Sequence, residues 1–179
     1  FYNEAERGQP FCYWFSSRDP HRPYKPNGWQ ESGIDIENIF VPPYLPDVTD
    51  VKKDIGDYYA EIQNFDRDVG SYIQLLKEMG QFENTLIIVC SDNGWQMPRG
   101  LANCYDFGTR IPLIISMPAK YKGGRIADDF VSLNDFAPTF LELAGIPVPE
   151  DMNARSFLNL LESEKTGTID KTRDFVVTG

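Results

Sequence analysis

The chain has 179 residues and a formal net charge of -10, from 17 lysines and arginines against 27 aspartates and glutamates. Its composition, with 41% hydrophobic and 25% charged residues, is typical of a folded globular protein and excludes a disordered or collagen-like one. The excess of negative charge disfavours binding to nucleic acid or to an anionic membrane, and no apolar run is long enough to span a bilayer.

The first predicted element is a strand at Phe11–Ser17, a nearly continuous apolar run typical of a strand covered on both faces. Three prolines in the next stretch exclude regular structure and predict a long loop. The longest helix is predicted from Val51 to Met79, because apolar residues recur there at steps of three and four. Thr49 or Asp50 is its expected N-cap and Gly80 its expected C-cap.

Strands are predicted at Thr85–Cys90 and Ile111–Ser116, followed by helices at Leu133–Leu143 and within residues 155–163. Residues 174–179 are predicted to begin a last strand. The alternation of buried strands with amphipathic helices predicts an α/β fold, with a parallel or mixed sheet and helices on both faces.

The three cysteines are an odd number without the spacing of a disulfide framework or a zinc site. Cys12 and Cys90 lie inside apolar runs and are predicted to be core residues. The chain begins without a methionine or a signal peptide, and we expect further sequence on its N-terminal side.

Polar clusters follow two of the predicted strands, and ligands of open α/β sheets bind at the carboxyl ends of strands. Asp92 and Asn93 follow one strand and offer a carboxylate and an amide oxygen, donors suited to Ca²⁺ or Mg²⁺ rather than to zinc. The same Asp-Asn-Gly sequence is also common turn chemistry. Two ligands cannot fill a calcium site, which takes about six to eight oxygens.

The second cluster surrounds His21, the single histidine of the sequence. Two prolines flank it, and three cations lie nearby, at Arg18, Arg22 and Lys25. Such a loop is suited to binding an anion, with the histidine as a hydrogen-bond donor or acid. A solvated basic surface and a structural histidine are the alternatives.

Five segments, in their order and spacing, resemble the second half of the catalytic domain of the type I (formylglycine-dependent) sulfatases, on the side of the N-sulfoglucosamine sulfohydrolases. They are "FSSRDPHRPY", "DYYAEIQNFDRDVG", "LIIVCSDNGWQMPRG", "YDFGTRIPLIISMP" and "LNDFAPTFLELAGIPVP". The resemblance implies an alkaline-phosphatase-like mixed sheet that is incomplete on its N-terminal side. It also implies residues 1–145 as the distal half of the catalytic domain and residues 146–179 as a linker and the start of a smaller subdomain.

The resemblance further implies hydrolysis of a sulfuric ester or sulfamide in a sulfated carbohydrate, with Asp92 and Asn93 as two ligands of a single Ca²⁺. His21 would lie against the sulfate or its leaving atom, and Arg22 would contact the substrate. A formylglycine made from a Cys/Ser-x-Pro-x-Arg motif would be the nucleophile. The 179-residue sequence does not contain that motif. We therefore expect the isolated chain to be inactive.

Position 101 departs from the family pattern, because relatives of this type carry a lysine or arginine there and this chain has Leu101. Arg99, two residues earlier, is the candidate substitute for binding the sulfate, and a weakened site is the alternative. Two alternatives stay open: a phosphatase or phosphodiesterase of the same superfamily, and a noncatalytic or degenerate member that binds sulfated glycans. By family resemblance alone, we expect export to the periplasm, the lysosome or the outside of the cell.

Overall fold

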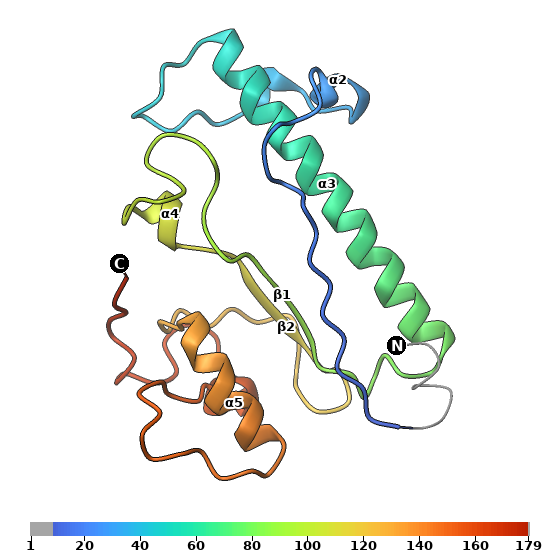
Figure 1. The fold of residues 1–179 in the computed structure, drawn as a ribbon, viewed down its shortest axis with the longest axis vertical. Helices are drawn as coiled ribbons and strands as arrows, with labels where there is room; N and C mark the ends of the chain where they lie inside the picture. The colour runs from blue at the N-terminus through green and yellow to red at the C-terminus, as the bar shows by residue number, and fades with distance from the viewer. Residues whose placement is uncertain (1–8, 179) are drawn as a thin grey trace. The chain divides into compact units, whose positions relative to one another are not determined.

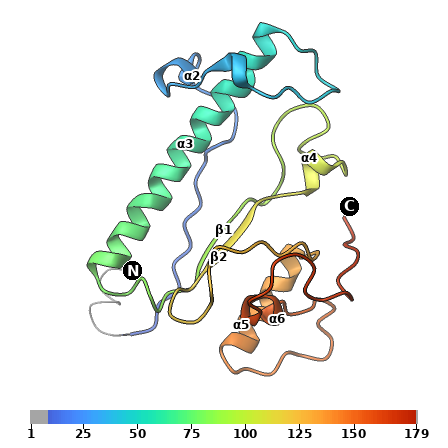
Figure 2. The same ribbon diagram turned by 180° about the vertical axis from the view of Figure 1, so that it is seen from behind.

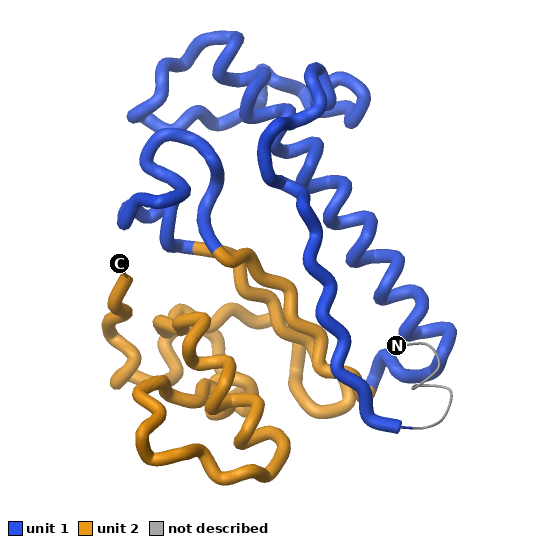
Figure 3. Tube along the Cα trace, in the orientation of Figure 1, with its two compact units in different colours: residues 1–83, 93–110 blue, residues 84–92, 111–179 orange. Residues whose placement is uncertain are grey.

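The computed structural model describes residues 9–178, and these fall into two compact units (Figure 3). The first unit comprises residues 1–83 and 93–110, and the second comprises residues 84–92 and 111–179. The chain passes between the units three times, after residues 83, 92 and 110. The second of these crossings separates Asp92 from Asn93, the two residues predicted to bind a metal.

The first unit is built on one long helix, α3 (Thr49–Glu78) (Figure 1). Its bounds agree with the apolar periodicity, and Gly80 follows its C-cap in the left-handed conformation, with φ of 66°. The predicted N-cap is wrong: Val48 occupies that position and its side chain makes no capping hydrogen bond. Helix α3 therefore depends on packing rather than on its cap, and Ile55 is completely buried.

Two short helices, α2 (Gly28–Glu31) and η1 (Ile36–Asn38), pack against α3. The approach is close at Gly56, where an added Cβ would lie 2.8 Å from the Cβ of Trp29. Asp57 of α3 accepts hydrogen bonds from the backbone N–H groups of Trp29, at 3.1 Å, and Asn27, at 3.2 Å. These contacts fix the polypeptide that follows His21 to the long helix.

The predicted strand at residues 11–17 is wrong, because the structure gives this segment no regular secondary structure. The segment runs beside α3 in both views (Figures 1 and 2), and Phe15 packs on Phe65 and Tyr72 at centroid distances of 6.3 and 4.8 Å. Packing on one side leaves the other exposed, so Trp14 is 80% exposed. Cys12 is also exposed, which corrects its prediction as a core residue.

The second unit contains strands β1 (Ile87–Cys90) and β2 (Leu113–Ser116), which pair antiparallel with Ile87 opposite Ser116. Both strands begin two residues later than predicted and end where predicted. This antiparallel pair is compatible with the predicted mixed sheet and not with a purely parallel one. Cys90 is half-buried, in keeping with its place in a strand.

The predicted helix at Leu133–Leu143 is present as η2 (Leu133–Asp135) running into α5 (Phe136–Leu143), and a short helix, α6 (Leu158–Glu162), follows. Ser132 caps the start through a capping box with Asp135. The predicted last strand is absent from residues 174–178, which are exposed and irregular, and residue 179 lies outside the described residues. No helix of the described residues is long and apolar enough to cross a membrane.

A buried arginine holds the second unit together. Arg173 donates to a carboxylate oxygen of Asp135 at 2.9 Å and to the backbone carbonyl oxygens of Phe130, Arg155 and Ser156. The side chain of Arg173 is only 2% exposed. One side chain thus joins the start of α5 to the segments before α6 and near the C-terminus.

Candidate active site

The loop that carries His21 is fixed by short-range contacts and two prolines. The His21 N–H donates to the Arg18 carbonyl oxygen at 2.8 Å, and the peptide bonds preceding Pro20 and Pro23 are both cis. The imidazole is exposed, with its Nδ1 2.6 Å from the Arg22 carbonyl oxygen. Proline restricts the backbone conformation of this loop, which limits the positions that the His21 ring can take.

Gln96 connects the His21 loop to the loop that begins at Asn93, and both belong to the first unit. Its side-chain Oε1 accepts from the Arg22 N–H at 2.5 Å, and its Nε2 lies 3.1 Å from His21 Nε2. The structure therefore brings together two loops about 75 residues apart in sequence. Sequence reasoning missed Gln96, since the only signal was a polar side chain three residues after Asn93.

Arg22, predicted to bind substrate, has its guanidinium engaged within the protein. It contacts both carboxylate oxygens of Asp54 on α3, with one contact at 2.8 Å, and its Nε donates to the Gln96 carbonyl oxygen at 3.0 Å. The guanidinium also lies 4.3 Å from the ring centroid of Tyr24. The hydrogen bond to Asp54 raises the pKa of Arg22, so this side chain stays a cation and holds the His21 loop on α3.

Arg99, the predicted substitute for the basic residue at position 101, lies in an aromatic setting. Its guanidinium is 5.1 Å from the ring centroid of Tyr44 and 5.2 Å from that of Tyr105, distances at which cation–π attraction acts. Its backbone has φ of 60°, which is uncommon for a residue with a side chain. Leu101, two residues later in the sequence, is 38% exposed and carries no charge.

The loop after Asn93 folds back tightly on α4 (Asp106–Thr109). Gly94 donates its N–H to the Gly108 carbonyl oxygen at 2.9 Å, and a Cβ on Gly94 would lie 1.8 Å from the Phe107 carbonyl oxygen. Trp95 stacks on Phe107 at a centroid distance of 5.0 Å. The glycine of the Asp-Asn-Gly sequence is therefore required by close backbone approach, and the loop is a packed structure rather than a simple turn.

Asp92 and Asn93 follow β1 with one residue between, as predicted. Asp92 is exposed and Asn93 is half-buried. Burial raises the pKa of the Cys90 thiol, and the negative charge of Asp92 acts in the same direction. Within residues 9–178, no cluster of three or more histidine, cysteine, aspartate or glutamate side chains has the arrangement of a metal site. The donor pair fits Ca²⁺ in chemistry but supplies only two of the oxygens it needs.

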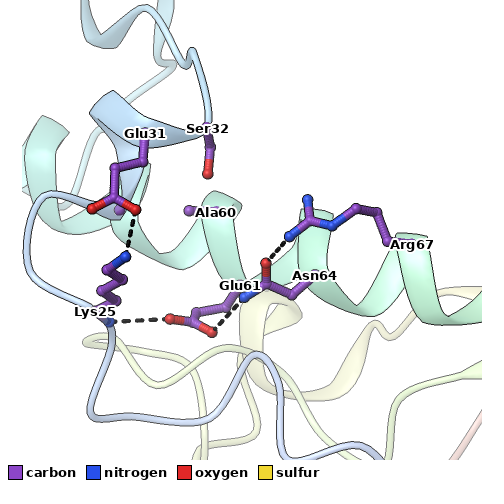
Figure 4. A pocket seen from close by; sticks show the side chains of 8 residues that line it. Lys25, Glu31, Ser32, Ala60, Glu61, Asn64 and Arg67 are labelled. Carbon is purple, nitrogen blue, oxygen red and sulfur yellow. Dashed lines mark hydrogen bonds and ion pairs between the residues drawn. The ribbon is translucent and has the colours of Figure 1, made fainter.

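A separate polar pocket of about 430 Å³ lies where the loop before α2 meets α3 (Figure 4). Lys25 pairs with Glu31, while Glu61 accepts from the Lys25 N–H at 3.1 Å and from Asn64 at 3.2 Å. Arg67 donates to the side-chain oxygen of Asn64. With Lys25 on Glu31 and Arg22 on Asp54, two of the three cations predicted around His21 are neutralised by carboxylates.

Comparison with known proteins decides the family. The family model described as Sulfatase matches residues 2–146. The chain belongs to the sulfatase family. It is 34% identical over 134 residues to an ulvan-active sulfatase of Formosa agariphila, covering 75% of this chain and 22% of that protein. It is 32% identical over 164 residues to the human N-sulphoglucosamine sulphohydrolase, covering 86% of this chain and 32% of that protein.

Two solved structures agree with the predicted fold. The crystal structure of yidJ from Bacteroides fragilis matches with a TM-score of 0.77 and 27% identity, over 92% of this chain and 39% of that one. A structure solved in complex with its substrate D-glucosamine-2-N,6-O-disulfate matches with a TM-score of 0.60 and 31% identity, over 67% of this chain and 25% of that one. The predicted alkaline-phosphatase-like fold is confirmed, and this chain spans a fifth to two fifths of the proteins it matches.

Proposed function

We propose that this chain forms the C-terminal part of the catalytic domain of a calcium-dependent sulfatase that hydrolyses sulfuric esters or sulfamides of sulfated sugars. The observation that carries the proposal is the junction of the His21 loop with the loop after Asn93, made by Gln96 across the first unit. Family membership supports the reaction class. The relative named as a sulphohydrolase of N-sulphoglucosamine supports a sulfated amino sugar as substrate.

His21 is the proposed catalytic residue, because its exposed ring can contact a sulfate group or the atom that leaves it. Arg99 is the proposed sulfate-binding cation. The rings of Tyr44 and Tyr105 position its guanidinium without neutralising the charge, so the side chain is suited to an anion. Arg22 contributes to substrate binding indirectly, by holding the His21 loop on Asp54.

Asp92 and Asn93 are the proposed calcium ligands on this chain, with the remaining oxygens supplied by sequence on the N-terminal side of it. A bound Ca²⁺ would neutralise the negative charge of a sulfate group. The formylglycine nucleophile is proposed to come from the same N-terminal sequence. The isolated chain is then expected to release no sulfate.

The experiment uses a protein that joins this chain to an N-terminal segment carrying the Cys/Ser-x-Pro-x-Arg motif. It is incubated with glucosamine bearing either an N-sulfate or a 6-O-sulfate, and both sulfate and the desulfated sugar are quantified. We expect sulfate release from at least one of them and a fall of about 100-fold or more in His21→Gln. Release of phosphate or phosphonate products instead, with no sulfate release, would replace the proposal by the phosphatase alternative.

A noncatalytic glycan-binding function is the second candidate, and Leu101 is the observation that favours it. A leucine cannot bind a sulfate or donate a proton, so the site has one cation fewer than the family pattern. Retained binding of a sulfated disaccharide without turnover in the longer protein supports this candidate. Restored turnover in Leu101→Arg would locate the loss at this position.

Location and partners follow from the same proposal. We propose an exported protein, because sulfatases of extracellular glycans act outside the cytoplasm, and one matched relative is named an extracellular sulfatase in Drosophila melanogaster. The proposed partner is a sulfated carbohydrate. A reporter fusion of the longer protein, assayed for export, checks this placement.

A further inference from the structure

We propose that Gln96 is a positioning residue that holds the His21 ring as the neutral Nδ1–H tautomer, with the lone pair of Nε2 facing the Gln96 amide. The meaning of this state for catalysis rests on the proposed sulfatase function. The state itself rests only on contacts within the first unit.

The orientation of the Gln96 amide follows from its contact with Arg22. A backbone N–H can only donate, so the atom 2.5 Å from the Arg22 nitrogen must be the amide oxygen. The other end of the same amide is then the NH₂ group, which can only donate. It is this donor that lies 3.1 Å from His21 Nε2.

The protonation of the ring follows from its two contacts. Nε2 faces a donor, so it carries a lone pair. Nδ1 lies 2.6 Å from the Arg22 carbonyl oxygen, which can only accept, so Nδ1 carries the hydrogen. The two contacts independently require the same tautomer.

Gln96 is fixed from both sides and is not a freely rotating amide. Its backbone carbonyl accepts from Arg22 Nε at 3.0 Å, while the same guanidinium is held by Asp54. On its other side, the Leu101 N–H donates to the Trp95 carbonyl oxygen at 2.8 Å, which closes the loop around it. Rotating the amide by half a turn would place the NH₂ group against the Arg22 N–H, so the observed orientation is the satisfied one.

This state determines what His21 can do in the resting protein. Its only hydrogen is committed to a backbone carbonyl, so the ring cannot donate from Nε2 until it takes up a second proton. It can accept a proton or a hydrogen bond at Nε2 once a substrate displaces the Gln96 amide. His21 therefore starts as an acceptor, and Gln96 competes with the substrate for Nε2.

The test is ¹⁵N NMR of the imidazole, for which a single histidine gives an unambiguous spectrum. The protein is labelled with ¹⁵N-histidine and measured at about pH 8, above the ordinary histidine range, and His21→Gln assigns the signals. The expected wild-type spectrum has a protonated, pyrrole-type Nδ1 and an unprotonated, pyridine-type Nε2. A protonated Nε2, or one averaged signal from two exchanging tautomers, would overturn the proposal.

Two variants separate positioning from a general structural effect. Gln96→Glu keeps the acceptor for the Arg22 N–H but turns the donor facing Nε2 into an acceptor, so the Nε2 signal should become pyrrole-type. Gln96→Met removes both contacts, so the Nε2 signal should move toward that of an unbonded pyridine-type nitrogen while Nδ1 stays protonated. Gln30→Glu, an exposed charge change in the same unit, is the matched control and should leave the spectrum unchanged.

Identical ring spectra in Gln96→Glu and Gln30→Glu would contradict the proposal. If Gln96→Glu does not fold, the wild-type and Gln96→Met spectra decide it alone. No sulfate ester is present in the sample, so the outcome is independent of whether the longer protein proves to be a sulfatase.

Discussion

The ion pair between Arg22 and Asp54 should stabilise the first unit. The contribution of Arg22 to the free energy of unfolding can be divided among its separate contacts. Arg22→Met removes the ion pair, the hydrogen bond to the Gln96 carbonyl oxygen and the contact with the Tyr24 ring. The paired side chains are 39% and 43% exposed, so the ion pair is worth about 1 kcal/mol. The hydrogen bond adds about 1 kcal/mol and the ring contact about 0.5 kcal/mol.

These terms give an expected loss of about 2.5 kcal/mol for Arg22→Met but only about 1 kcal/mol for Asp54→Ala, which removes the ion pair alone. The double variant should unfold like Arg22→Met, with a coupling of about 1 kcal/mol. All three tryptophans, Trp14, Trp29 and Trp95, lie in the first unit, so tryptophan fluorescence in urea reports on it. At about 2 kcal/mol per molar urea, the midpoints should fall by about 1.2 M and 0.5 M.

The matched control is Glu31→Gln, because the Lys25–Glu31 pair is 62% and 63% exposed and should be worth less than about 0.5 kcal/mol. Equal losses in Arg22→Met and Asp54→Ala, or a coupling near zero, would refute the division. A coupling near zero would mean that Asp54 does not hold the His21 loop in solution, and equal losses would mean that the other contacts of Arg22 contribute nothing beyond the ion pair.

Three further predictions concern stability, pH and thiol chemistry. Arg173→Met leaves Asp135 buried without its partner and should cost about 4 kcal/mol, lowering the melting temperature by about 12 °C in far-UV circular dichroism. The control Lys171→Met, at an exposed neighbouring residue, should change the melting temperature little. Equal effects of the two substitutions would contradict the role of Arg173. Burial raises the pKa of Tyr24 to about 12 from 10.0, so the unfolded chain loses this proton first and stability should fall as pH rises between these values. In urea titrations, Tyr24→Phe should lose less stability over this pH range than wild type. An unchanged dependence of stability on pH would exclude Tyr24 as its cause. Cys12 and Cys104 are exposed, whereas burial raises the pKa of Cys90, so an aromatic disulfide reagent at about pH 8 should modify two thiols quickly and one slowly. The slow phase should disappear in Cys90→Ala. Three equal rates of modification would argue against the burial of Cys90.

Local patterns predicted the helices better than the first strand. The periodicity of α3 extends over 30 residues, so its ends were predicted to within about two residues. Residues 11–17 show why an apolar run is ambiguous: whether it forms a strand depends on its neighbours, and here Phe15 packs on α3 while Trp14 stays exposed. The prediction that Cys12 is buried was wrong for the same reason.

The candidate site was predictable in its motif residues but not in their partners. His21, Asp92 and Asn93 stand in recognisable sequence contexts, although their roles stay proposals. Gln96 and Asp54 have no such context, and they reach the His21 loop only because the chain folds back over about 75 and 32 residues. Pairing over such distances is a tertiary property, so local sequence patterns do not reveal the contact between Arg22 and Asp54.

Calcium-dependent sulfate release is the measurement that tests the central proposal most directly. A protein joining this chain to an N-terminal segment with the nucleophile motif is assayed on sulfated glucosamine, with calcium chelated and then restored. Wild type should lose sulfate release on chelation and regain it with calcium, whereas Asp92→Ala and Asn93→Ala should remain inactive and bind less calcium. Full activity and unchanged calcium content in both variants would contradict the account.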